Sequence, residues 1–137
     1  MEYFVYCRNK PDVDGLRAEH QEAHWSFMDQ YDDRMLARGP TLNEDRSAPT
    51  GSVHIVDLES EAEAMAFAYD EPYARAGVFG DIIIRRWTNA LKRTMWDFEG
   101  DGSEPRFLFM AKGREGAGVT ARRNELLEAH RAYLNAP

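Results

Sequence analysis

The chain has 137 residues, a length typical of one domain with room for a short appendage. Hydrophobic residues make up 43% of it and aromatic residues 12%, which is enough for a packed core and argues against disorder over most of the length. The formal net charge of −7 argues against binding to nucleic acid or anionic membranes, because both need basic patches.

The first part of the chain predicts a strand followed by a long helix. Residues 2–8 are apolar on both faces, which is typical of a buried strand. Asp14 is a candidate cap for a helix whose apolar residues recur at three- and four-residue steps from Leu16 to about Arg38. We expect Gly39-Pro40 to end this helix and the polar residues 41–51 to form a loop or an open hairpin.

The second part predicts a strand, a helix and a strand. Val53–Leu58 has strand character, and Ser60 with Glu63 forms a capping box before a short alanine-rich helix that Pro72 ends. Another strand is expected over Ile82–Trp87. The order βαββαβ predicts a ferredoxin-like α+β fold. Its run of three isoleucines needs cover on both faces of the sheet, so we expect two copies to pack sheet against sheet as a dimeric α/β barrel.

One eight-residue pattern occurs twice: Arg17-x-Glu19-x-x-Glu22-Ala23-His24 and Arg123-x-Glu125-x-x-Glu128-Ala129-His130. An apolar strand candidate precedes each copy, Tyr3–Cys7 and Arg106–Met110. We therefore expect a main domain over residues 1–97, a linker over 98–105 and a C-terminal strand–helix half-repeat over 106–137. His130 is then a structural copy of His24, in a unit that extends or caps the barrel.

Four side chains could carry chemistry, each with a structural alternative. His24 lies at the edge of the apolar stripe, where an imidazole can move a proton at neutral pH or can simply be a packed core histidine. Arg17 could bind an anion or belong to a charged helix face. His54 could touch a ligand or be a satisfied interior group. Tyr73 could donate a hydrogen bond to a substrate or anchor the turn.

Other site classes find little support. His20 and His24 have the spacing of a helical metal pair, but no further cluster supplies ligands, so we expect no metal. No phosphate-binding loop or dinucleotide fingerprint occurs, so we expect no cofactor. The single Cys7, the lack of a signal-peptide pattern and the absence of a run approaching ~20 apolar residues predict a cytoplasmic protein. Abundant arginine with scarce lysine suggests a bacterial source.

A set of short motifs over about residues 1–90 resembles the YciI-like (YCII-related) family. These motifs are Tyr3–Cys7, Arg17 and His24 seven residues apart, Gly39-Pro40, Gly51-Ser52 and Glu71-Pro72-Tyr73-x-x-Ala76-Gly77-Val78-Phe79. The resemblance implies a dimeric α+β barrel with a histidine and an aspartate in the active site. It also implies action on small cyclic or aromatic compounds, as in a dehydrochlorinase of hydroxylated aromatics. The family pattern has aspartate before Pro-Tyr, whereas this chain offers Glu71 there and Asp70 one residue earlier.

The sequence therefore predicts a small cofactor-independent enzyme: a lyase, isomerase or hydrolase for a small cyclic or aromatic compound. His24 would be the general acid and base, oriented by Glu71 or Asp70. The expected substrate-positioning residues are Tyr73, His54 and Arg17. The alternative is a non-catalytic dimer that binds a small molecule or assists a pathway enzyme.

Overall fold

The computed structural model describes residues 1–136, so Pro137, the last residue of the expected C-terminal half-repeat, lies outside the described residues. The chain divides into two compact units. The first comprises Met1–Thr88 together with Arg93–Phe98, and the second comprises Asn89–Lys92 and the chain from Glu99 onwards.

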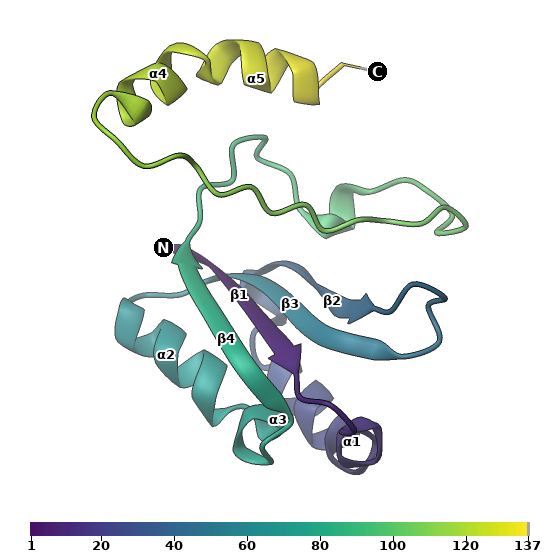
Figure 1. Cartoon of the computed structure of the whole chain (residues 1–137). Coiled ribbons are helices and arrows are strands. Elements are labelled where there is room, and N and C mark those ends of the chain that lie inside the picture. The colour runs from purple at the N-terminus through teal and green to yellow at the C-terminus, as the bar shows by residue number, and fades with distance from the viewer. Residues whose placement is uncertain (137) are drawn as a thin grey trace. The chain divides into compact units, whose positions relative to one another are not determined.

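The first unit is a four-stranded antiparallel sheet with helices on one face (Figure 1). Its strands are β1 (Glu2–Asn9), β2 (Met35–Leu42), β3 (Pro49–Asp57) and β4 (Phe79–Arg86), in the order β2-β3-β1-β4. Its helices are α1 (Asp14–Asp29), α2 (Glu61–Asp70) and α3 (Pro72–Arg75), with short 3-10 turns η1 (Asp32–Arg34) and η2 (Met95–Asp97). The predicted α+β fold with βαββαβ order is confirmed.

The core lies between the helices and the inner face of the sheet. Tyr3, Val5 and Cys7 of β1 are buried on this face, and the strand register places Ile84 opposite Val5 and Ile82 opposite Cys7. Burial raises the pKa of the Cys7 thiol to about 12, so this cysteine stays protonated and behaves as a small apolar residue.

The outer face of the sheet is also apolar. The register places five side chains together on it: Phe4, Tyr6, Val53, Ile55 and Ile83. The isoleucine run in β4 thus serves both faces, as its pattern indicated.

The end of the predicted first helix is wrong. Helix α1 ends at Asp29, and the chain returns as strand β2, in which Gly39 lies opposite Val53 and Pro40 opposite Ser52. Strand β2 is at the edge of the sheet, where proline is tolerated because its missing N–H removes no ladder hydrogen bond. Gly39-Pro40 therefore lies within a strand and does not end a helix.

The second helix begins where its cap predicted. The Ser60 hydroxyl accepts from the Glu63 backbone N–H at 3.1 Å, and the Glu63 carboxylate accepts from the backbone N–H of Glu59 at 2.6 Å. The first helix differs slightly, because Asp14 is its first residue and Val13 occupies the cap position.

The second unit contains two short helices, α4 (Val119–Glu125) and α5 (Leu127–Leu134). The predicted strand Arg106–Met110 is not formed, since these residues pair with no other strand. A lone strand has no partner for its backbone groups, and the four-stranded sheet uses none of this segment. Across residues 1–136, no helix combines the length and apolar character needed to cross a membrane.

Candidate functional site

A cavity of about 840 Å³ lies in the first unit, between α1 and the β2–β3 side of the sheet. Residues from α1, β2, β3, α3 and η2 line it. The polar and charged lining includes Arg17, His24, Arg38, Ser52, His54 and Tyr73, and two tryptophans, Trp25 and Trp96, add aromatic surface.

A histidine–carboxylate pair lies at the wall of this cavity. His24 Nδ1 is 2.8 Å from Glu71 Oε2, and both side chains are buried. The same carboxylate oxygen accepts from the backbone N–H of Tyr73 at 3.1 Å. His24 lines the cavity, whereas Glu71 lies behind it and does not.

Local backbone geometry points Glu71 inward. Because proline disfavours helical geometry in the residue before it, Glu71 adopts an extended conformation, φ −66° and ψ 148°, between α2 and α3. In this position it caps α3 with its side chain. Asp70 ends α2 on the exposed side and pairs with Arg75 at 3.0 Å. The carboxylate that reaches His24 is thus Glu71, and Asp70 is not in the site.

The hydrogen bonds assign the roles of the two imidazole nitrogens. An ionised carboxylate only accepts, so Nδ1 of His24 carries the proton shared with Glu71. The other nitrogen, Nε2, has no hydrogen-bond partner among residues 1–136. A neutral His24 in this tautomer therefore has a free lone pair at Nε2, which suits it to accept a proton.

Tyr73 and Arg17 extend the site beside His24. The Tyr73 ring stacks on the imidazole with centroids 4.1 Å apart and 17° between the planes, and the Arg17 guanidinium carbon lies 4.4 Å from the Tyr73 ring centroid. Arg17 Nη1 also donates to Asn9 at 3.1 Å and to the Ser52 hydroxyl at 3.4 Å. Burial raises the pKa of the Tyr73 hydroxyl, which therefore stays protonated.

Arg17 thus does not belong to an exposed, charged face of α1. It is buried although its neighbours Glu19 and Glu22 are exposed, because Asn9 and Ser52 supply oxygen partners from the sheet. A buried, hydrogen-bonded guanidinium at a cavity wall is suited to an anionic ligand oxygen.

His54 is the second histidine of the site. It lies on the inner face of β3, with its ring centroid 5.9 Å from that of His24 and 5.5 Å from Phe67. Its Nδ1 is buried and has no hydrogen-bond partner among the described residues. Burial, with a smaller contribution from nearby His24, lowers the pKa of His54 to about 3, so the ring is neutral at pH 7.

The structure therefore brings together five of the six predicted site residues: Arg17, His24, His54, Glu71 and Tyr73. It adds residues that were not predicted for the site. Ser52, named only within the Gly51-Ser52 motif, is a partner of Arg17, and Trp25 and Trp96 are aromatic lining. Trp25 follows His24 directly, so its place on the same helix was a usable signal. Within residues 1–136, no three His, Cys, Asp or Glu side chains are grouped closely enough to hold a metal ion.

Comparison with known proteins gives consistent matches to the first unit. The sequence profile of the YCII-related domain matches residues 1–88. Protein YciI from Escherichia coli O6:H1 is 32% identical over 92 residues, covering 62% of this chain and 94% of that protein. An uncharacterized protein from Haemophilus influenzae is 29% identical over 92 residues, with the same coverage of each chain.

One solved structure adds a ligand to the comparison. The 5-chloro-2-hydroxyhydroquinone dehydrochlorinase TftG from Burkholderia phenoliruptrix, in complex with 2,5-dihydroxybenzoquinone, is 28% identical with a TM-score of 0.60. The match covers 64% of this chain and 94% of that one.

Replacing Glu71 by alanine is expected to lower the free energy of unfolding by about 2–4 kcal/mol, since it leaves the His24 Nδ1–H and the Tyr73 backbone N–H buried without their acceptor. Urea unfolding followed by circular dichroism measures the change. Asp70→Ala is the matched control, and its stability should stay near that of the wild type because Asp70 is exposed. Equal losses in the two variants would contradict the assigned role of Glu71.

The buried His54 predicts a specific pH dependence of stability. An unfolded histidine titrates near 6.5 and folded His54 near 3. Between these values the unfolded chain binds one proton more, so stability falls on acidification, by up to about 1.4 kcal/mol per pH unit from this residue.

Urea unfolding at several pH values between 7.5 and 4.5 tests this dependence. His54→Gln should show a shallower loss of stability below pH 6.5 than the wild type. Above pH 7 the two curves should run parallel, because neither state binds the proton there. Parallel curves over the whole range would show that His54 is not buried in its neutral form.

Proposed function

We propose, because the chain belongs to the family of YCII-related domains, that it is a small cofactor-independent enzyme that moves a proton on a small cyclic or aromatic compound. The single observation that supports this most is the pair of His24 and Glu71, 2.8 Å apart, with the imidazole at a cavity and the carboxylate behind it. This arrangement fits a general base with an orienting partner.

In the proposed mechanism, His24 Nε2 takes a proton from the substrate. In an isomerisation it returns this proton at another position of the ring; in an elimination the leaving group departs as an anion and the proton passes from Nε2 to solvent. Glu71 is a positioning residue that holds the proton on Nδ1 and stabilises the imidazolium as it forms. Such proton transfer contributes typically ~10²–10⁴-fold to a rate, which is sufficient for elimination or isomerisation of an activated substrate. A lyase or isomerase is therefore favoured over a hydrolase, which would need a placed water in addition.

The lining of the cavity supports a flat, oxygen-bearing substrate. Trp25 and Trp96 offer aromatic surface, Arg17 offers a cation for an anionic oxygen, and the Tyr73 hydroxyl offers a hydrogen bond. TftG, which is named a dehydrochlorinase and binds 2,5-dihydroxybenzoquinone, is a relative with a ligand of this kind. A hydroxylated ring is thus the substrate class that we propose.

Replacing His24 by alanine is expected to lower kcat by at least about 100-fold while leaving the far-ultraviolet circular dichroism unchanged, because it removes the proton acceptor. The first substrates to assay are 5-chloro-2-hydroxyhydroquinone, followed by chloride release, and other hydroxylated rings. His20→Ala is the matched control: His20 lies one turn earlier on α1, does not line the cavity and should leave turnover intact.

Two results would count against this mechanism. Near-native turnover in His24→Ala would exclude His24 as the acid–base residue. A wild-type chain that binds these rings but converts none of them would favour a non-catalytic binding dimer.

We also propose that two copies pair through the outer face of the sheet as an α/β barrel. The support is the apolar patch of Phe4, Tyr6, Val53, Ile55 and Ile83, which the register places side by side on three neighbouring strands. An isologous contact of this patch with itself would cover it in both copies.

The charge-introducing substitution Ile83→Lys is expected to convert the dimer to a monomer, since it places a cation within the apolar patch, beside Tyr6. Size-exclusion chromatography with light scattering gives the mass. Met65→Lys, at an exposed apolar residue of α2, is the control and should remain dimeric. A wild-type chain that is monomeric at every accessible concentration would exclude the pairing.

A further inference from the structure

The turn η2 lies outside the matched domain but inside the first unit. The family profile ends at residue 88, yet residues 93–98 belong to the same compact unit as the sheet. The two residues of η2 that line the cavity, Met95 and Trp96, thus come from a part of the chain that the family comparison does not cover.

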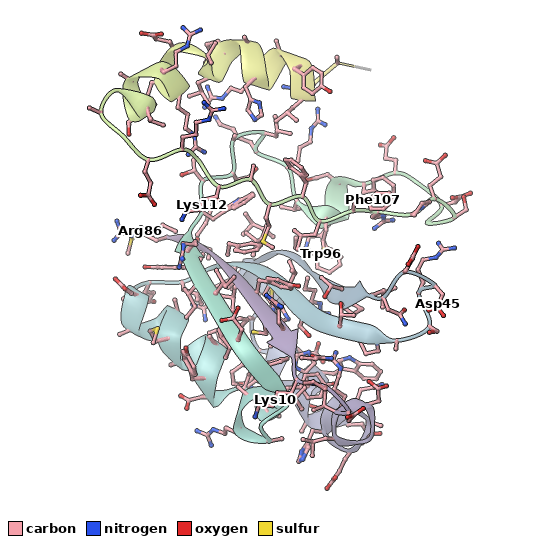
Figure 2. The ribbon with its side chains drawn as sticks, viewed as in Figure 1. Lys10, Asp45, Arg86, Trp96, Phe107 and Lys112 are labelled. Atoms are coloured by element: carbon pink, nitrogen blue, oxygen red, sulfur yellow. The ribbon has the colours of Figure 1, made fainter. Side chains whose placement is uncertain are left out.

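Two hydrogen bonds fix η2 to the free edge of β2. The Trp96 indole N–H donates to the Met35 carbonyl at 3.1 Å, and the backbone N–H of Arg38 donates to the Met95 sulfur at 3.1 Å. The side chain of Trp96 therefore reaches from η2 toward the sheet (Figure 2). Both contacts use backbone groups that an edge strand would otherwise present to solvent.

The turn is also held from within. Thr94 and Asp97 form a capping box, in which the Thr94 hydroxyl accepts from the Trp96 backbone N–H at 3.3 Å and the Asp97 carboxylate accepts from the Thr94 backbone N–H at 2.6 Å. Internal capping and the indole hydrogen bond thus hold Trp96 against the edge of β2.

The indole nevertheless remains accessible: Trp96 is 56% exposed and lines the cavity together with Trp25, which is equally exposed. A large aromatic ring whose polar N–H is already satisfied has only its apolar surface left to offer. Aromatic surfaces favour flat partners in offset-stacked or edge-to-face contact, and the neighbouring Met95 sulfur is a further soft contact for a ring.

We propose that Met95 and Trp96 form a specificity wall of the site, against which the flat ring of the substrate packs. This inference rests on the proposed function, since it names the part of the same cavity that selects planar over non-planar rings. The wall positions the ring, and His24 on α1 performs the proton transfer. The selectivity for planar compounds therefore depends on residues beyond the family domain.

Isothermal titration of the full chain with 2,5-dihydroxybenzoquinone, and with the non-planar ring 1,4-cyclohexanediol as comparison, tests the wall. Trp96→Ala should weaken binding of the quinone about tenfold and reduce its preference over the diol, because the stacking surface is lost. Trp96→Phe keeps a ring and should stay within about threefold of the wild type. Trp87→Ala removes a tryptophan that does not line the cavity and should bind as the wild type does.

The outcomes separate the proposed wall from the proposed function. Unchanged quinone affinity and preference in Trp96→Ala overturns the wall, and if His24→Ala still abolishes turnover, the proposed function survives. Should Trp96→Ala fail to fold by circular dichroism, Trp96→Leu retains bulk without a ring, and wild-type preference in that variant overturns the wall equally. A wild-type chain that binds none of the hydroxylated rings overturns the wall and the proposed substrate class together.

Discussion

The Glu71 carboxylate is the constraint on which the site depends. One of its oxygens accepts from both the His24 ring and the backbone N–H of Tyr73, so the same group begins α3 and orients the imidazole of α1. Pro72 holds Glu71 extended, and Tyr73, now fixed by the cap, stacks on the ring that the carboxylate holds. The resemblance seen in the sequence implied an aspartate at this position, and in this chain the longer glutamate reaches the histidine.

The sequence predicted the elements that are determined by residues close together along the chain. The opening strand is a continuous apolar run. Helix α2 begins directly after Ser60, because the Ser60 side chain accepts from the Glu63 backbone N–H, which has no partner within the helix. His24 stood out because an imidazole at the edge of an apolar stripe must be either packed or used. The sequence repeat, by contrast, was a misleading signal. Its second copy is divided between two helices at Leu126, and the strand expected before it is not formed. A similar sequence does not by itself provide a neighbouring strand for pairing.

Elements that depend on contacts with residues far away in the sequence could not be predicted in the same way. Residues after Asp29 carry helix-compatible spacing, and only pairing with β3 makes Met35–Leu42 a strand. Arg17 shows the same limit. Its neighbours mark a charged face, but Asn9 and Ser52, far apart in sequence, accept its hydrogen bonds in the fold and make burial possible. The equivalent Arg123 is exposed, so the pattern alone does not decide burial.

The edge of β2 links stability to the shape of the site. On its outer side, an edge strand such as β2 presents backbone groups that pair with no neighbouring strand. The η2 turn covers two of these groups with a tryptophan and a methionine, and these are the side chains that reach the cavity. Met95 and Trp96 thus cover the edge of β2 and line the cavity at the same time. A change that loosens η2 from β2 must alter the site, even though it touches neither His24 nor Glu71.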